Sequence, residues 1–354
     1  MRSIVLLLLS VASILAQAPS APLATEIRSI IDEYENSVRA NTQKLIAAAT
    51  EEEKNKFRAS IPSAGPYATK MLKLVQANLD QPDVVKGVNW LVTGAAGFPE
   101  GQEALKMLGT TFADRAGIAE AVKQLEYHGL PAEPVLKAVV EKNTHRDEKA
   151  AALYALGAIH FKNFDASADR DSAAASKSKA LECFQQLYAD YEDVTIQGFK
   201  LSDSVAKMFF EMTSLQVGCE APQIEGKDAD GVNFKLSDYR GKYVIVIFWG
   251  GWCHACHGTL PLMNQAAAQL KDKNAVVIGV NTDIETEAKK ALADYQVSFR
   301  NVLDNTSSGP NTTLYNLRNF PTLYLIDPKG LIAIKNGSLD AMVAQIVAAQ
   351  GATK

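Results

Sequence analysis

Between residues 19 and 215 the hydrophobic positions follow a helical period with few strand signals. The spacing of three and four residues is seen in two stripes, which are Ile27, Ile30, Ile31, Tyr34 and Leu105, Leu108, Phe112. Clusters of Gly, Pro and Asn divide the region into about six to eight helices. Helices over 147–161 and 173–191 resemble one antiparallel pair of a tetratricopeptide-like array, and an irregular bundle is the alternative because no fixed-period consensus recurs. The pattern predicts an all-α helical domain over residues 19–215.

From about Val217 the pattern changes to one of strands alternating with helices. Polar and apolar residues alternate over 223–225 and 232–236, which predicts a hairpin with Asp230 and Gly231 in its turn. The continuous apolar run 243–249 is typical of a central strand buried on both faces. Further strands are expected at 275–280, 300–303, 322–326 and 331–335, and helices at 253–270, 285–295, near 314 and at 339–349. Residues 216–354 are therefore predicted to form an α/β domain whose sheet has helices on both faces.

Composition and length agree with two domains and an ordinary soluble protein. The 354 residues exceed one usual domain of roughly 100 to 200 residues, so we predict an α+β two-domain chain. A formal net charge of -4 with 21% charged residues gives none of the basicity that attracts a phosphate backbone. Nucleic acid is therefore not an expected partner.

Residues 1–18 have the pattern of a secretory signal peptide. Arg2 precedes an apolar run of about a dozen residues, which is shorter than the roughly 20 that a bilayer-spanning helix needs. We expect cleavage near residues 16–18, although Pro19 disfavours a cut directly after Ala18. The alternative is an uncleaved membrane anchor. The prediction is an exported protein, periplasmic or secreted, with no stable membrane span after signal cleavage.

Two of the four cysteines, Cys253 and Cys256, lie directly after the buried strand and at the expected start of a helix. The two-residue spacing lets their sulfurs meet, and backbone N–H groups at a helix N-terminus favour the thiolate. Cys253 is the expected nucleophile, and Cys256, one helical turn further on, is the expected resolving thiol. This chemistry needs no metal and no cofactor. For Cys183 and Cys219 we expect isolated thiols, with a disulfide between them as the alternative.

Several short motifs precede or follow this pair of cysteines along the chain. They are Val217-Gly218, Ala221-Pro222, Leu236-Ser237-Asp238-Tyr239-Arg240-Gly241-Lys242, Phe248-Trp249-Gly250-Gly251-Trp252-Cys253 and Phe320-Pro321-Thr322. Together they resemble the TlpA/ResA-like redoxin family, a thioredoxin-like family related to AhpC/TSA, over residues 216–354. The resemblance implies a thioredoxin fold with an inserted βα unit near 281–304, and a cis Pro321 that faces the disulfide. It also implies exchange with cysteine-containing client proteins and an upstream redox partner. The supporting residues would be Trp252, His254, Phe320, Pro321 and Thr322.

Three positions depart from common patterns of this family. Ile247 and Thr259 stand where many relatives carry a carboxylate that takes the proton from the second cysteine. His254 stands between the cysteines, where a protonated imidazole would stabilise the Cys253 thiolate and raise the reduction potential. A solvated His254 with little influence is the alternative.

Other functions fit parts of the sequence. Cys253 to His257 match the C-x-x-C-H signature of c-type haem attachment, and the same cysteines with His254 and His257 are known types of metal ligand. A peroxiredoxin motif would need Pro and Thr or Ser where Val246 and Gly250 stand. The helical domain could also be the main functional part, as a scaffold or peptide-binding array with an accessory redoxin domain. His128, His145 and His160 are scattered, and we expect surface or core histidines there.

Overall fold

The computed structural model describes residues 22–167 and 169–351, so the expected signal peptide at 1–18 lies outside the described residues. These residues form two compact units, one within Met1–Lys162 and Gln185–Leu201 and the other within Asn163–Phe184 and Ser202–Lys354. The domain boundary at 215/216 remains a prediction. None of the helices described is long and apolar enough to cross a membrane.

The first part of the described chain is helical, as predicted. Its α-helices are α1 (Leu23–Ala47), α2 (Glu51–Ser60), α3 (Gly65–Ala77), α4 (Val84–Gly94), α5 (Pro99–Thr110), α6 (Ala119–Gln124), α7 (Glu133–Lys142), α8 (Arg146–Ala166), α9 (Arg170–Tyr191) and α10 (Leu201–Ser214). Two short 3-10 helices, η1 (Leu125–Tyr127) and η2 (Leu130–Ala132), lie between α6 and α7. Helices α8 and α9 correspond to the predicted pair at 147–161 and 173–191. Their assignment to a tetratricopeptide-like array remains a prediction.

Two details of the helical region differ from the prediction. The described part holds ten α-helices, α1 to α10, rather than six to eight. Helix α2 begins at a capping box, in which the Glu53 N–H donates to Thr50 Oγ1 at 3.2 Å. A helix count based on Gly and Pro alone therefore missed it. A small hairpin of β1 (Thr195–Ile196) and β2 (Phe199–Lys200) was also missed. Its turn residues Gln197 and Gly198 both have positive φ, as a two-residue hairpin turn requires.

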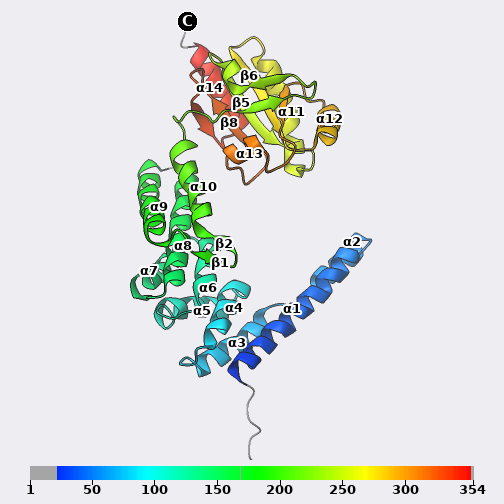
Figure 1. Ribbon diagram of the computed structural model, residues 1–354. Coiled ribbons are helices and arrows are strands. Elements are labelled where there is room, and N and C mark those ends of the chain that lie inside the picture. Colours follow the sequence, from blue (N-terminus) through cyan, green and yellow to red (C-terminus); the bar gives the residue numbers. More distant parts are fainter. Residues whose placement is uncertain (1–21, 168, 352–354) are drawn as a thin grey trace, which may run out of the picture. The chain divides into compact units, whose positions relative to one another are not determined.

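The second part contains a five-stranded sheet in the order β7-β6-β5-β8-β9. Its three central strands, β6, β5 and β8, are labelled in Figure 1. The strands are β5 (Tyr243–Trp249), β6 (Ala275–Asn281), β7 (Arg300–Leu303), β8 (Thr322–Ile326) and β9 (Ile332–Lys335). Strands β5, β6 and β7 are parallel, whereas β8 is antiparallel to β5, and β9 to β8. The helices that connect or follow them are α11 (His254–Leu270), α12 (Glu285–Asp294), α13 (Pro310–Leu314) and α14 (Leu339–Gly351). This is a thioredoxin-like sheet with β5 at its centre, and α12 and β7 occupy the range expected for the inserted unit.

A separate hairpin of β3 (Glu225–Lys227) and β4 (Asn233–Lys235) precedes the sheet and is followed by the 3-10 helix η3 (Leu236–Tyr239). The predicted first strand, 223–225, was placed two residues too early. Asp228 explains the position of the turn, because its Oδ1 accepts from the N–H groups of Asp230 and Val232. Gly231 follows with φ +79°, a conformation that favours glycine.

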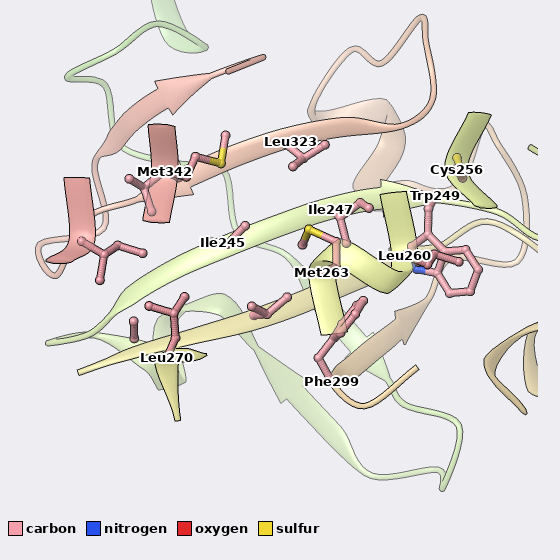
Figure 2. Packing of buried hydrophobic residues seen from close by; sticks show 14 of the residues in the cluster. Ile245, Ile247, Trp249, Cys256, Leu260, Met263, Leu270, Phe299, Leu323 and Met342 are labelled. Atoms are coloured by element: carbon pink, nitrogen blue, oxygen red, sulfur yellow. The ribbon is translucent and has the colours of Figure 1, made fainter. Parts of the chain in front are cut away.

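The two faces of β5 pack into two separate hydrophobic cores. Ile245, Ile247 and Trp249 belong to a core that includes Leu260 and Met263 of α11, as Figure 2 shows, and residues of α14. The alternate residues of β5 pack with the β3–β4 hairpin, η3 and the residue after α13. The expectation of helices on both faces is therefore right for one face. On the other face Phe234 of the hairpin and Leu236 of η3 pack against the sheet, together with Leu215, Ala221, Ile224 and Tyr315.

Tyr315 shows how the second core accommodates a polar group. It is buried at 1% exposure, and its hydroxyl donates to the carbonyl oxygen of Pro222 at 2.8 Å. Burial raises the pKa of this phenol well above its ordinary value, since an ionised side chain would lose its hydration there. The hydroxyl therefore stays neutral and remains a hydrogen-bond donor.

Candidate active site

The two cysteines of the C-x-x-C motif form a disulfide at the end of the central strand. Strand β5 ends at Trp249, three residues form a turn, and Cys253 is the N-cap of α11. The Cα atoms of Cys253 and Cys256 are 5.3 Å apart. Cys253 is 6% exposed and Cys256 is fully buried. An incoming sulfur therefore has access to Cys253 before Cys256.

The start of α11 places a backbone hydrogen-bond donor at the Cys253 sulfur. The Cys256 backbone N–H donates to Cys253 Sγ at 3.2 Å, in the manner of a helix cap. The first turn of α11 carries no acidic side chain. Because helix N-terminal N–H groups and the helix dipole favour negative charge, this setting would stabilise a thiolate at Cys253.

The Phe320-Pro321-Thr322 segment lies beside the disulfide because β8 pairs with β5. Thr322 is directly opposite Phe248 in the antiparallel register. The Phe320–Pro321 peptide bond is cis, which confirms what the family resemblance implied. Phe320 packs against the core that contains both cysteines, and its ring lies 5.2 Å from that of Trp252 in an edge-on arrangement. The structure thus brings the predicted aromatic and proline residues together around one disulfide.

The two histidines of the motif have different surroundings. His254 is exposed, and its ring centroid lies 5.7 Å from that of His257. His257 stacks on Tyr295 at 4.6 Å, and its Nε2 lies 2.8 Å from the carbonyl oxygen of Gly251. The two cysteine sulfurs are thus bonded to each other, and His257 Nε2 is within hydrogen-bonding distance of the Gly251 carbonyl oxygen. This is the geometry of a redox disulfide.

Two of the three positions that depart from the family pattern, Ile247 and Thr259, bring no carboxylate to the site. Ile247 is fully buried in the core beneath α11, and Thr259 Oγ1 donates to the Ala255 carbonyl oxygen at 3.4 Å. A carboxylate nevertheless reaches the loop from another element. Asp283, which follows β6, accepts from the Gly251 N–H with its Oδ2 at 2.6 Å.

The sequence reasoning missed the residues Asn281, Thr282 and Asp283 as parts of this site. Thr282 Oγ1 accepts from Trp252 Nε1 at 3.2 Å, and Asn281 Nδ2 donates to Asp283 Oδ2 at 2.9 Å. The sequence does carry a signal for these residues, because three polar residues stand together at the end of a buried strand. In sheets with parallel strands, functional side chains gather at the carboxyl ends of neighbouring strands.

The cysteines outside the motif do not form a second disulfide. Cys183 is buried and Cys219 is partly exposed, and both are thiols. The Cys219 Sγ donates to the Thr213 carbonyl oxygen at 3.4 Å. This agrees with the first of the two expectations for these residues.

Comparison with known proteins agrees with this geometry. The model of the AhpC/TSA family matches residues 217–335. The thiol-disulfide oxidoreductase ResA of Bacillus cereus (strain ZK / E33L) is 33% identical over 129 residues, which are 36% of this chain and 73% of the relative. The chain belongs to the ResA-like thiol-disulfide oxidoreductases. The redoxin resemblance inferred from the motifs is thereby confirmed.

Other ResA-like relatives match the same part of the chain. The thioredoxin-like protein YneN of Bacillus subtilis (strain 168) is 36% identical over 121 residues, 33% of this chain and 69% of the relative. Among solved structures, the thioredoxin domain of a thiol-disulfide oxidoreductase from Bacteroides vulgatus is 32% identical. That match covers 38% of this chain and 98% of the other, with a TM-score of 0.36. These matches cover between 33% and 38% of the chain.

Proposed function

We propose that this chain is an extracytoplasmic thiol-disulfide oxidoreductase that exchanges its Cys253–Cys256 disulfide with protein substrates. The observation that carries the proposal is the difference between the two sulfurs. Cys253 caps the N-terminus of α11 and accepts the Cys256 N–H, whereas Cys256 is fully buried. The accessible cysteine is thus also the one whose thiolate the helix favours.

In the reducing direction the Cys253 thiolate attacks a substrate disulfide, so that a mixed disulfide forms and one substrate thiolate leaves. The Cys256 thiolate then attacks Cys253 Sγ, which forms the Cys253–Cys256 disulfide and releases the second substrate thiolate. Two electrons pass from the chain to the substrate, and protons restore the two substrate thiols. In the oxidising direction the same steps run backward. The reduction potential of the pair relative to that of its partner sets the direction.

Trp252, Phe320, Pro321 and Thr322 support this exchange by forming the surface beside Cys253. Trp252 is 57% exposed and its ring meets that of Phe320, so the pair offers an apolar contact to a substrate chain. Thr322 Oγ1 donates to the Asn319 carbonyl oxygen at 2.7 Å and so holds the segment before Pro321. These contacts support the proposed roles of Trp252, Phe320 and Thr322.

A trapping experiment tests the proposal. In a Cys256→Ser variant the resolving thiol is missing, so we expect substrate proteins to remain attached to Cys253 as mixed disulfides. The attached proteins should be released by dithiothreitol and identified by mass spectrometry. The matched control is the Cys253→Ser/Cys256→Ser variant, which should capture none. Equal capture by both variants would contradict the proposed exchange.

His254 is proposed to make the pair more oxidising than thioredoxin, whose potential is about -270 mV. The exposed imidazole next to Cys253 can carry a proton, and the positive charge would stabilise the thiolate of the reduced form. We expect a glutathione titration of the full chain to give a potential above the thioredoxin value, and His254→Ala to lower it. A wild-type potential at or below about -270 mV would contradict this role.

Export and the domain boundary complete the proposal. The apolar pattern of residues 1–18 supports export to a compartment where the disulfide persists, the periplasm or the exterior. The partners would then be cysteine-containing client proteins and an upstream redox protein of the same compartment. The family match begins at residue 217, which supports a boundary near 215/216.

A further inference from the structure

The backbone of Gly251, two residues before Cys253, is held at its N–H and at its carbonyl oxygen by two side chains. Its N–H donates to Asp283 Oδ2 at 2.6 Å, and its carbonyl oxygen lies 2.8 Å from His257 Nε2. Asp283 follows β6, whereas His257 lies on α11, so two separate elements meet at one residue of the turn. We call Asp283 and His257 the Gly251 clamp.

The turn that the Gly251 clamp holds is the one that delivers Cys253 to the helix. The Cys253 N–H donates to the Gly250 carbonyl oxygen at 3.1 Å, so Gly251 and Trp252 are the central residues of a tight turn. The side chain of Trp252 is held as well, because its Nε1 donates to Thr282 Oγ1. Three side chains therefore fix the two central residues.

Both members of the clamp are themselves held in place. Asp283 is 8% exposed, and its Oδ2 also accepts from Asn281 Nδ2 at 2.9 Å. The Asp283 N–H donates to Asn281 Oδ1 at 3.0 Å. His257 stacks on Tyr295 at 4.6 Å, which orients the imidazole. A buried, hydrogen-bonded carboxylate of this kind keeps its geometry, because the loss of a partner would leave a charged group unsatisfied.

We propose that Asp283 and His257 are positioning residues that set the redox equilibrium of the Cys253–Cys256 pair. This inference rests on the proposed exchange function and deepens it. The clamp acts through the turn: while Gly251 is held, Cys253 stays at the N-cap, within bonding reach of Cys256. Release of Gly251 would let the turn sample other conformations, so closing the disulfide would cost more conformational entropy. The disulfide form would then be less favoured.

The experiment is a redox titration of the full chain. Reduced chain and glutathione disulfide are equilibrated with the Cys253–Cys256 disulfide and two glutathione molecules, and the fraction of disulfide is read after alkylation by mass spectrometry. We expect Asp283→Ala to lower the equilibrium constant for disulfide formation about tenfold, which is a rise of about 30 mV in the reduction potential. Asp283→Asn keeps an oxygen that can accept the Gly251 N–H, so its constant should stay within about threefold of wild type.

Two further variants complete the set. His257→Phe keeps an aromatic ring against Tyr295 but cannot bond the Gly251 carbonyl oxygen, and we expect a drop of about threefold. Glu285→Ala removes a carboxylate from the same stretch of chain without touching the turn, since Glu285 bonds Lys289 Nζ at 2.7 Å. This matched control should titrate like wild type. If Asp283→Ala does not fold, His257→Phe decides the question by the same titration.

The outcomes separate this inference from the proposed function. A wild-type chain that does not equilibrate with glutathione would overturn the exchange function itself. If the wild-type chain equilibrates normally, and Asp283→Ala and His257→Phe have the same equilibrium constant for disulfide formation as wild type, the positioning role alone is overturned. If Asp283→Asn shifts as far as Asp283→Ala, the carboxylate acts through its charge and the clamp is rejected.

Discussion

Replacement of Cys253 by serine is expected to lower the rate of disulfide exchange by at least about a thousandfold, the scale on which removal of a nucleophile acts. Serine keeps the size of the side chain but cannot form a disulfide with a substrate, and its hydroxyl stays protonated where the thiol would ionise. The measurement is the initial rate of insulin reduction by dithiothreitol with the full chain as catalyst.

Two variants give this prediction its controls. Cys256→Ser should also lose turnover, but it should still form the mixed disulfide in the first step. Cys219→Ser should keep the wild-type rate, because Cys219 lies outside the disulfide and bonds the Thr213 carbonyl oxygen. Substantial residual activity in Cys253→Ser would show that another cysteine attacks the substrate, and the assigned roles would be wrong.

The largest expected effect on stability comes from Trp249→Ala. Trp249 is fully buried at the end of β5, where it packs in the core beneath α11 (Figure 2). Removal of such a large buried aromatic side chain usually costs about 3–5 kcal/mol. The indole Nε1 also donates to Asn301 Oδ1 at 2.7 Å, and the variant would leave that oxygen without this donor. Urea unfolding of the full chain, followed by circular dichroism, gives the change in the free energy of unfolding.

Trp249→Phe separates packing from hydrogen bonding. It keeps most of the ring volume and loses the bond to Asn301, so we expect a cost of about 1–2 kcal/mol. A loss below about 1 kcal/mol for Trp249→Ala would mean that the neighbouring side chains refill the space, contrary to a closely packed core.

The reactive pair was predictable because its setting is local. A continuous apolar run predicts a buried strand, and the two cysteines stand where the following helical pattern begins. This order along the chain predicts that Cys253 lies at the start of the helix, and the structure has it as the N-cap of α11. The strands at 300–303 and 322–326 were predicted with the bounds that the structure has, and each ends directly before an aspartate that marks a turn, Asp304 and Asp327.

The misses have physical causes as well. Helix α2 starts at a Thr-x-x-Glu capping box rather than after Gly or Pro, so punctuation alone did not count it. The short β1–β2 hairpin has only two residues in each strand, which is too little for a period of two to stand out. On the second face of the sheet the helix expected near 314 is only five residues long, and Phe234 of the β3–β4 hairpin and Leu236 of η3 are among the residues that pack there.

The amino-acid sequence by itself determined the order of strands and helices after residue 216, the position of the disulfide at a helix start, and membership of a redoxin family. These depend on neighbouring residues and on short motifs. Only the tertiary structure decided that Asp283 and His257 meet at Gly251, and that Trp252 lies against Thr282 and Phe320. For Asp283, Thr282 and Phe320 the physical reason is strand pairing: β6 and β8 flank β5 in the sheet, so segments distant in sequence converge on the turn before Cys253, whereas His257 reaches Gly251 from the first turn of α11.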